Sequence, residues 1–234
     1  MNKQLQLPVF KYLPHAFELG LFSKEKFTCD ICKTEREYRY IGPFYVEKKK
    51  SKGTNKVTNS QKKICPWCIE SGKAAEILNA DFKDVDILEQ TCYNKEHLDE
   101  EICDAVIQTW LYRTPNFVAD STELWPICCN DFTSFVGYLG TGDKRTQNLN
   151  LEKGESLSEI TAILERKSVT DLFLELDDAL ALETERLNEI GYDIENGSIL
   201  ADRLKTEENN IVGYLFKCLE CKRYRLHVDF IQKP

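Results

Sequence analysis

The sequence lacks the features that mark membrane-spanning and secreted chains. Its 234 residues contain no apolar run near the roughly 18 residues that a membrane span requires. The N-terminal stretch MNKQLQLPVFKYLPHAFELG has no apolar core of the kind that a secretion signal needs. We therefore expect a cytoplasmic protein without a membrane partner.

Catalytic signatures are missing as well. The sequence contains no nucleophile elbow, Gly-rich phosphate loop, His-Glu-x-x-His helix or dinucleotide fingerprint. Its 3 histidines (His15, His97 and His227) are isolated from one another along the chain. Carboxylates are plentiful, but on helix faces they usually serve solubility. We therefore expect a protein that is not an enzyme, and we assign no catalytic or cofactor-binding residue.

What the sequence does have is cysteine, 10 residues in all. In a reducing compartment, paired Cys-x-x-Cys spacing indicates metal binding, whereas in a secreted chain the same residues could form disulfides. Cys29–Cys32 and Cys65–Cys68 flank the β-rich segment Tyr38–Val46. Each pair is expected to turn both sulfurs inward from a tight turn, so that four thiolates enclose one structural Zn²⁺. A thioredoxin-like redox pair would need a βαβ context that the sequence does not have.

The sequence allows a second metal site but does not fix its ligands. Cys218 and Cys221 form another Cys-x-x-Cys pair, and Cys128 with Cys129 are the nearest candidates to complete it. Of these two neighbours, we expect one to bind the ion and the other to pack. His227 and Cys103 are fallback ligands, and all four cysteines could also be buried without metal. Cys92 and Cys103 lack a partner at this spacing and are expected in the core.

Charge is distributed unevenly along a chain whose net charge is −8. Residues 1–83 carry 16 basic and 9 acidic side chains, residues 84–131 carry 2 and 11, and residues 151–212 carry 6 and 16. The acidic blocks would repel phosphate over most of the surface, so nucleic acid is not the expected partner. Seven lysines in Lys48–Lys63 predict a solvated loop or a contact to phosphate or an acidic partner. No aromatic residue lies among them to stack bases.

The order of elements predicts an α+β fold. We expect a zinc-ribbon-like β module over residues 1–83 and an α+β remainder over 84–234, which could pack as a single domain. The remainder has a helical middle, and it ends in a Cys-x-x-Cys β-hairpin over Tyr214–Phe230 that returns to strands near the metal.

The N-terminal half carries further local signals. Prolines at positions 8 and 14 predict an extended segment over residues 5–22, with Val9, Tyr12 and Phe17 across the core. Helices are expected over residues 70–79 and within residues 85–111.

In the C-terminal half, two capping boxes open helices. Ser156 and Ser168 are each followed three residues later by an acid. The second helix is expected to run unbroken over Thr170–Ile190 and to end at Gly191. Its apolar face holds Leu172, Leu176, Leu180 and Leu187. A further short helix is expected over residues 198–208.

Several separate stretches match one protein family in its own order and cover most of the chain. They are Phe27–Cys32 (FTCDIC), Tyr40–Tyr45 (YIGPFY), Cys65–Ile69 (CPWCI) with Gly72, Tyr112–Phe117 (YRTPNF), Trp125 with Cys129–Asp131, Phe135–Tyr138 (FVGY) and Tyr214–Phe230. In these stretches the chain resembles the CbrC family of small bacterial cytoplasmic proteins. It departs from that family in the enlarged Lys48–Lys63 segment and in having Cys128–Cys129 where the family has a His-Cys pair, with a further cysteine near Thr133. The resemblance implies a link to colicin tolerance and to immunity proteins encoded beside toxins, and it supplies no catalytic residue.

These observations predict an intracellular zinc-stabilised binding protein, an immunity or tolerance factor that neutralises a bacterial toxin, such as a nuclease, by direct binding. Toxin nucleases present basic clefts, and the acidic blocks of this chain would complement them. One candidate face is the helix over Thr170–Ile190, with Glu175, Asp177, Asp178, Glu183 and Glu185. The alternative is a zinc-ribbon module that binds nucleic acid or a transcription component through residues 24–63. A third interpretation is a thiol-based sensor built from Cys128, Cys129, Cys218 and Cys221.

Overall fold

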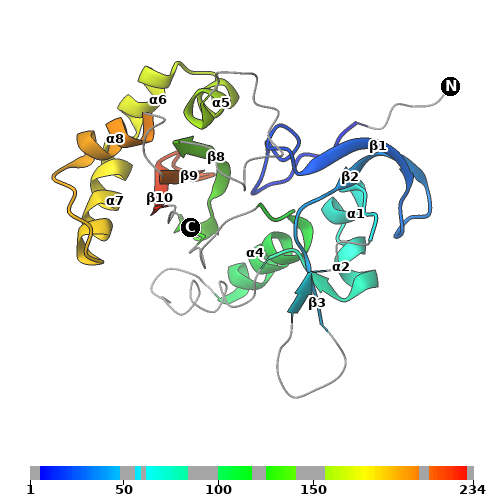
Figure 1. The fold of residues 1–234 in the computed structure, drawn as a ribbon. Coiled ribbons are helices and arrows are strands. Elements are labelled where there is room, and N and C mark those ends of the chain that lie inside the picture. Colours follow the sequence, from blue (N-terminus) through cyan, green and yellow to red (C-terminus); the bar gives the residue numbers. More distant parts are fainter. Residues whose placement is uncertain are drawn as a thin grey trace. The chain divides into compact units, whose positions relative to one another are not determined.

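Two units with separate sheets make up the chain (Figure 1). The computed structural model describes residues 6–47, 56–58, 62–83, 100–117, 125–140, 156–205 and 211–230. The N-terminal unit covers Met1–Phe132 and the C-terminal unit covers Thr133–Pro234. Each combines helices with small antiparallel sheets, as expected for an α+β protein. The domain limits predicted from the sequence, 1–83 and 84–234, stay a prediction.

The N-terminal unit consists of short strand pairs and short helices. Its strands are β1 (Phe22–Thr28) paired with β2 (Glu35–Tyr40), β3 (Tyr45–Glu47) between β4 (Lys56–Thr58) and β5 (Ala80–Asp81), and β6 (Ile127–Cys128) paired with β7 (Asp131–Phe132). Its described helices are α1 (Pro66–Glu70), α2 (Lys73–Leu78) and α4 (Glu100–Arg113). Among the described residues, no helix has both the length and the apolar character needed to cross a bilayer.

The helices of this unit refine the predictions. The helix expected over residues 70–79 is two short helices, because Gly72 adopts φ +79° between them. Within 85–111, α4 confirms a helix from Glu100, and Val106 and Trp110 are buried as expected. Residues 84–99, with Cys92, and the side chains of residues 100–103, with Cys103, lie outside the described residues. Most of Lys48–Lys63 also lies outside them, apart from β4 and residues 62–63.

The segment before β1 is not extended as predicted. Residues 11–20 form successive turns, and Leu19 and Gly20 donate backbone hydrogen bonds to His15 and Phe17. Tyr12 is fully buried and its hydroxyl donates to Asp131 Oδ1 at 2.6 Å, whereas Val9 is 70% exposed. The two prolines prevent a helix, but they permit turns as readily as a strand.

A buried lysine organises the aromatic core of the N-terminal unit. Lys83 is 1% exposed, and its Nζ donates to the carbonyl oxygen of Pro115 at 2.8 Å. The same ammonium lies 4.1 Å from the centroid of the Trp125 ring. Trp110 stacks on Phe132 with ring centroids 4.6 Å apart. Lys83 therefore fixes the segment that follows α4 through a hydrogen bond and a cation–π contact.

The C-terminal unit is a three-stranded antiparallel sheet packed against helices. The sheet has the order β10–β9–β8, with β8 over Ser134–Gly140, β9 over Ile211–Lys217 and β10 over Tyr224–Phe230. The hairpin predicted over Tyr214–Phe230 is thus confirmed, and it pairs with β8. The helices are α5 (Leu157–Leu164), α6 (Val169–Glu175), α7 (Asp177–Glu189) and α8 (Gly197–Lys205). One core holds side chains of the sheet and these helices, including Leu139, Leu172, Leu180, Leu204 and Leu226.

The ends of these helices follow their sequence signals. Ser156 and Glu159 form the predicted capping box, and Ser168 Oγ accepts from Asp171 N–H at 3.1 Å. At the end of α7, Gly191 adopts φ +98° and donates to Asn188, while Tyr192 donates to Leu187. This pair of bonds is a Schellman motif, so the predicted glycine stop is confirmed.

One break was not predicted. The helix expected over Thr170–Ile190 is interrupted at Leu176, which has φ −90° and ψ 2° and separates α6 from α7. The predicted apolar face is nevertheless buried, since Leu172, Leu176, Leu180 and Leu187 are each at most 3% exposed. No glycine or proline marks the break, so tertiary packing outweighs the local helical pattern here.

Candidate metal centre

The first cysteine pair lies in the turn between β1 and β2. Cys29 N–H donates to the carbonyl oxygen of Thr34 at 3.0 Å and so closes the hairpin. Inside the turn, the backbone N–H of Ile31 points at Cys29 Sγ at 3.4 Å. Lys33 adopts φ +56°, which lets the chain turn back into β2. The turn therefore directs both sulfurs to one side, as the Cys-x-x-Cys spacing predicts.

The second pair lies at the start of a helix, which differs from the predicted turn. Cys65 is the N-cap residue of α1, Pro66 follows at its first position, and Cys68 lies in its first turn. Proline is favoured at this position because the first helical N–H groups have no intrahelical partner. The N-terminal metal module thus combines a hairpin turn with a helix start, and a zinc-ribbon form is not established for it.

These two elements bring four sulfurs together. The Sγ atoms of Cys29, Cys32, Cys65 and Cys68 all lie within 4.8 Å of one another. The Cys29–Cys68 and Cys32–Cys65 sulfur separations are both 3.9 Å. A tetrahedral ion bound to four thiolates at about 2.3 Å requires sulfurs about 3.8 Å apart. The four residues therefore fit a tetrahedral metal ion such as Zn²⁺.

Burial and crowding make the thiols interdependent. Three of the four cysteines are buried and Cys32 is half-buried. Hydrogen bonds from Cys65 and Cys68 lower the pKa of Cys29 far below its ordinary value. The hydrogen bond between Cys29 and Cys65 raises the pKa of Cys65 to about 11. The pKa of Cys68 is also raised by its neighbours. Four adjacent thiolates repel one another, so a divalent cation at their centre would relieve this repulsion.

A basic side chain of β2, Arg36, contacts the cluster. The guanidinium of Arg36 lies 4.7 Å from the centroid of the Trp67 ring, and its Nη2 lies 3.8 Å from Cys32 Sγ. Desolvation alone would lower the pKa of Arg36, but the sulfurs of Cys32 and Cys65 outweigh it and raise that pKa. The indole N–H of Trp67 donates to the carbonyl oxygen of Gln6 at 3.0 Å. Trp67 thus fixes Arg36 beside the sulfurs, a role that the sequence pattern did not reveal.

This contact yields a testable prediction. We expect Arg36→Met to weaken metal retention by about 10- to 100-fold, because outer-shell partners orient metal ligands and balance their charge. Competition with a chromophoric chelator measures the effect. Arg39→Met is the matched control, since Arg39 lies on the same strand and pairs with Glu25 rather than with a sulfur. Equal metal affinity in the two variants would show that Arg36 does not contribute to metal retention.

The remaining predicted ligands form two pairs, Cys128 with Cys129 in the N-terminal unit and Cys218 with Cys221 in the C-terminal unit. Each pair is described in its own unit. In the N-terminal unit, Cys129 (φ +53°) and Asn130 (φ +59°) form the two-residue turn between β6 and β7. Two positive φ values in such a turn are those of type I′. The sulfurs of Cys128 and Cys129 lie 3.9 Å apart, with Cys129 exposed.

In the C-terminal unit, the turn between β9 and β10 repeats the geometry of the first pair. Cys218 N–H donates to the carbonyl oxygen of Arg223 at 2.9 Å, and Cys221 N–H points at Cys218 Sγ at 3.4 Å. Lys222 follows with φ +62°, as Lys33 follows the first pair. The shared sequence Cys-x-x-Cys-Lys therefore folds into the same kind of turn twice. His227, a fallback ligand, lies outside both groups and near Asp229, with Nε2 3.4 Å from Oδ1.

A polar network anchors this second turn to α5. Glu165 accepts hydrogen bonds from Lys217 and, at 2.5 Å, from the hydroxyl of Tyr224. Burial raises the pKa of Tyr224, and the bond to Glu165 raises it further. Burial alone would raise the pKa of Glu165, but the hydrogen bonds from Lys217 and Tyr224 outweigh burial and lower that pKa. Both strand ends beside Cys218 and Cys221 are thereby fixed to the helix.

Comparison with known proteins places these features in a family. The model of an uncharacterised protein family, UPF0167, matches residues 7–180. The UPF0167 proteins Mb2317 of Mycobacterium bovis and MT2352 of Mycobacterium tuberculosis are each 28% identical over 226 residues, covering 96% of this chain and 94% of theirs. The UPF0167 protein PA1536 of Pseudomonas aeruginosa is 30% identical over 134 residues, which is 57% of this chain and 65% of its own. No solved structure is significantly similar.

Proposed function

Because this chain belongs to the uncharacterised protein family UPF0167, whose description assigns no activity, we propose its function from its own residues. We propose that it is a non-enzymatic, zinc-stabilised intracellular protein that neutralises a bacterial toxin by binding a basic surface of that toxin. The resemblance to the CbrC family is compatible with membership of UPF0167. That resemblance implies a link to toxin tolerance, which supports the proposal. The observation that carries the proposal is an exposed acidic surface with apolar side chains on the C-terminal unit.

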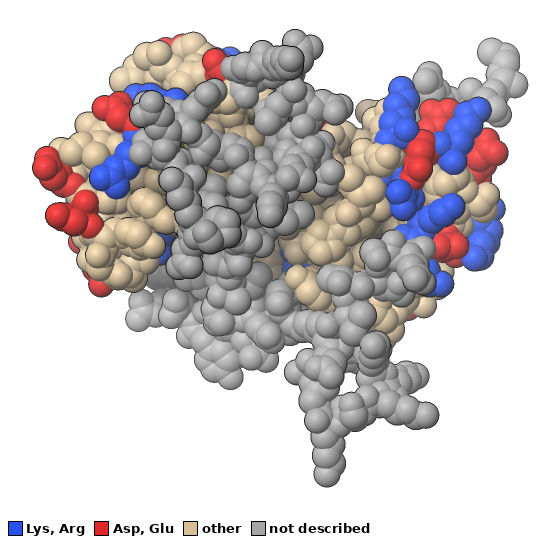
Figure 2. All heavy atoms as spheres, viewed as in Figure 1, with Lys and Arg blue, Asp and Glu red and all other residues tan. Residues whose placement is uncertain are grey.

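This surface, which we call the acidic ridge, runs along α6 and α7. Its carboxylates are all exposed: Glu175, Asp177, Asp178, Glu185 and Glu189. Between them, Leu174 is 72% exposed and Leu182 is 55% exposed. At the left of Figure 2, acidic side chains (red) lie among uncharged residues (tan), with a few basic side chains (blue) beside them.

One carboxylate of the predicted face does not belong to it. Glu183 is 4% exposed and points into the unit, where Oε1 accepts from Val228 N–H at 2.6 Å. Arg186 donates to both oxygens of the same carboxylate. Helical periodicity explains the difference, since position 183 lies on the buried side of α7 together with Leu180 and Leu187.

Charge and apolar area together favour a protein partner. Carboxylates around an interface accelerate association with a basic surface and select against acidic partners. The exposed Leu174 and Leu182 would add apolar contacts of the kind that hold such a complex together. A nuclease toxin has a basic cleft because its substrate is polyanionic, so it fits the negative charge of the ridge.

The metal is assigned a structural role in this proposal. Zn²⁺ held by Cys29, Cys32, Cys65 and Cys68 would have its four tetrahedral positions filled by protein sulfur, which leaves none for water or substrate. We propose a second zinc at Cys128, Cys129, Cys218 and Cys221. Each ion would stabilise the turns that carry its ligands and would supply no reaction.

Nucleic-acid binding through residues 24–63 is the competing proposal, and the described part of that segment favours it less. Basic residues on β1 and β2 alternate with acidic ones, as in Lys24–Lys26 and Glu35–Glu37, and Arg39 pairs with Glu25. Phosphate binding would require cations that are not neutralised by their neighbours. A gel-shift assay at low salt distinguishes the two proposals, because only the competing one predicts a shifted band.

The proposal predicts the effect of reversing charge on the ridge. We expect Asp178→Lys, Glu185→Lys and Glu189→Lys together to abolish protection of cells that co-express a toxin encoded beside this gene. In vitro, association with that toxin should slow by about tenfold or more at low salt, because rim charges control the encounter rate. The control is Glu18→Lys, Glu35→Lys and Glu37→Lys, which changes net charge equally on exposed positions of the N-terminal unit.

Two results would count against the proposal. If every such toxin kills cells equally with and without the wild-type protein, the immunity function is wrong. If protection occurs but the ridge variant and the control protect equally, the function stands and the ridge is not its binding surface.

A further inference from the structure

A stacked pair of aromatic rings follows the end of α7 in the C-terminal unit. Tyr192 lies on Phe230, the last residue of β10, with ring centroids 4.2 Å apart and an angle of 13° between the ring planes. Phe230 packs in turn against the core of the unit, whereas Tyr192 is 41% exposed. Ile190, two residues earlier, is 60% exposed. The chain therefore presents an aromatic and an aliphatic side chain to solvent on a support that is anchored in the core.

Backbone and side-chain hydrogen bonds hold this platform in one conformation. Gly191 and Tyr192 are the two residues that close the Schellman motif at the end of α7. Asn188 binds the chain beyond the motif at two points: its Nδ2 donates to the carbonyl oxygen of Ile194 at 2.8 Å, and its Oδ1 accepts from Ile194 N–H at 2.9 Å. Residues 187–194 thus form a closed turn that fixes the position of Tyr192. A partner would meet a preformed surface, which lowers the cost of binding.

The chain around this platform is acidic. Its exposed carboxylates are Glu189, Asp193 and Glu195. Within the described part of the chain, none of the three carboxylates forms an ion pair or a side-chain hydrogen bond. Residues 187–202 contain no lysine or arginine, and the preceding Arg186 donates both of its carboxylate bonds to Glu183. The C-terminal end of a helix adds partial negative charge. The platform therefore carries negative charge that its described neighbours do not neutralise.

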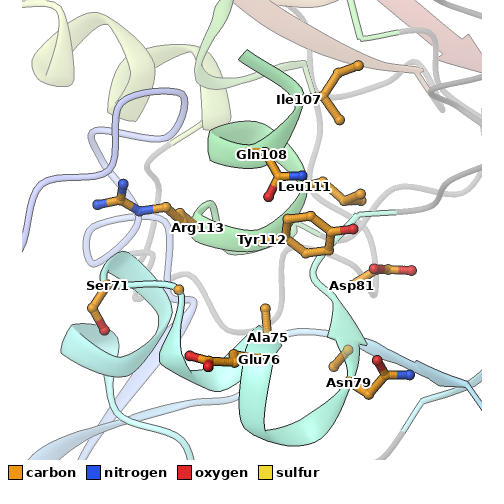
Figure 3. Close-up of a pocket in the computed structure, with 12 residues that line it drawn as sticks. Ser71, Ala75, Glu76, Asn79, Asp81, Ile107, Gln108, Leu111, Tyr112 and Arg113 are labelled. Atoms are coloured by element: carbon orange, nitrogen blue, oxygen red, sulfur yellow. The ribbon is translucent and has the colours of Figure 1, made fainter. Parts of the chain in front are cut away.

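A hollow bordered by α2, β5 and α4 in the N-terminal unit does not offer such a surface (Figure 3). Ala75 and Ala80 on its apolar floor are at most 6% exposed. On its rim, Arg113 pairs with Glu70, and Asp81 already has an interaction of its own. The end of α7 therefore offers more contact area and more free charge to a charged partner than this hollow does.

We propose that the end of α7 binds an arginine side chain of a basic protein partner, with the guanidinium stacked on the ring of Tyr192 and attracted by the carboxylates around it. This inference rests on the proposed function, because it names the group that would anchor a toxin's basic surface. A guanidinium is planar and weakly hydrated, so it stacks on an aromatic ring better than the ammonium of lysine does. Tyrosine and arginine are also enriched among the residues that carry most of the energy of an interface.

Titration of the full-length, metal-loaded protein with acetylated tri-arginine amide tests the inference without a toxin. We expect saturable binding at low salt with a Kd on the order of 1 mM, and amide NMR shifts that concentrate in residues 189–195. Acetylated tri-lysine amide carries the same charge and should bind about two- to fivefold more weakly, because its ammonium stacks less well. Acetylated tri-glutamate amide should not bind.

Two variants locate the contact. Tyr192→Leu keeps an apolar side chain and removes the ring, so it should weaken tri-arginine by about two- to fivefold and abolish its advantage over tri-lysine. Asp193→Asn should weaken both peptides by about twofold, because it removes one exposed charge. Tyr38→Leu and Glu37→Gln on β2 are the matched controls and should leave binding unchanged. Urea denaturation verifies that Tyr192→Leu is folded; if it is not, Asp193→Asn and the lysine peptide decide the matter.

Three results would each overturn the inference: no saturable binding of tri-arginine at about 20-fold above that Kd, equal binding of the arginine and lysine peptides, or unchanged binding in Tyr192→Leu. The proposed function would survive them, because the rest of the acidic ridge would still be available to a toxin. Conversely, a wild-type protein that binds tri-arginine as expected but protects no cell would remove the toxin as partner and leave the arginine site in place.

Discussion

Replacing Cys29 and Cys32 with serine is expected to unfold the N-terminal unit. Both sulfurs belong to the buried group of four, and serine supplies neither the charge nor the softness that Zn²⁺ requires. Structural zinc contributes on the order of 10 kcal/mol in small metal-folded domains, which is comparable to the whole stability of a typical domain, about 5–15 kcal/mol. The metal-free unit would therefore have too little stability to remain folded.

Tryptophan fluorescence reports the unfolding of the N-terminal unit alone. All 3 tryptophans of the chain (Trp67, Trp110 and Trp125) lie in the N-terminal unit. We expect the double variant to show a red-shifted, solvent-exposed tryptophan emission and to bind at least one zinc fewer per chain than wild type. Lys24→Ser, an exposed change on β1 of the same hairpin, should alter neither signal. Native-like emission from a double variant that has lost its zinc would refute a structural role for this site.

Replacing Glu183 with alanine is expected to cause a large loss of stability in the C-terminal unit. Its carboxylate binds Arg186 through two hydrogen bonds and also accepts from the backbone N–H of Val228, so it joins α7 to β10. Removing one partner of a buried ion pair costs about 3–5 kcal/mol. The Arg186 side chain is 34% exposed, so we expect the lower end, about 3 kcal/mol.

Urea denaturation followed by far-UV circular dichroism measures this loss. Glu185→Ala is the matched control, because Glu185 is an exposed acid two positions away on the same helix and should change stability by less than about 0.5 kcal/mol. The loss of stability in Glu183→Gln should lie between those of Glu183→Ala and Glu185→Ala, since its amide oxygen can still accept from Val228. A midpoint for Glu183→Ala equal to that of Glu185→Ala would contradict the structural assignment of this carboxylate.

Features set by local chemistry could be predicted from the sequence. The Cys-x-x-Cys spacing indicated that Cys29 joins Cys32 and that Cys218 lies near Cys221, because each pair needs only one turn. Ser156 and Gly191 marked helix ends through side-chain capping and positive φ, which depend on neighbouring residues alone. The two strands of the hairpin around Cys218 and Cys221 could also be predicted, and β10 alternates between buried and less buried residues whereas β9 is buried almost throughout.

Features set by tertiary packing could not be predicted. No glycine or proline signals the break at Leu176. The periodicity of Leu180 and Leu187 places Glu183 on the buried side of α7, but its bond to Val228 of β10 has no signal in the sequence. Arg36 contacts the cysteine cluster because Trp67, far along the chain, supports its guanidinium. Val9 is exposed, and the residues after it form successive turns in place of the predicted extended segment, with Tyr12 held by Asp131 far along the chain.

The central claim is that four thiolates enclose a zinc ion and that this ion maintains shape rather than reactivity. Zinc-edge X-ray absorption of protein purified without chelator tests it most directly. The account predicts at least one zinc per chain, surrounded by four sulfurs at about 2.3 Å with no oxygen neighbour. A folded protein without zinc, or zinc bound by water or carboxylate in place of sulfur, would contradict it.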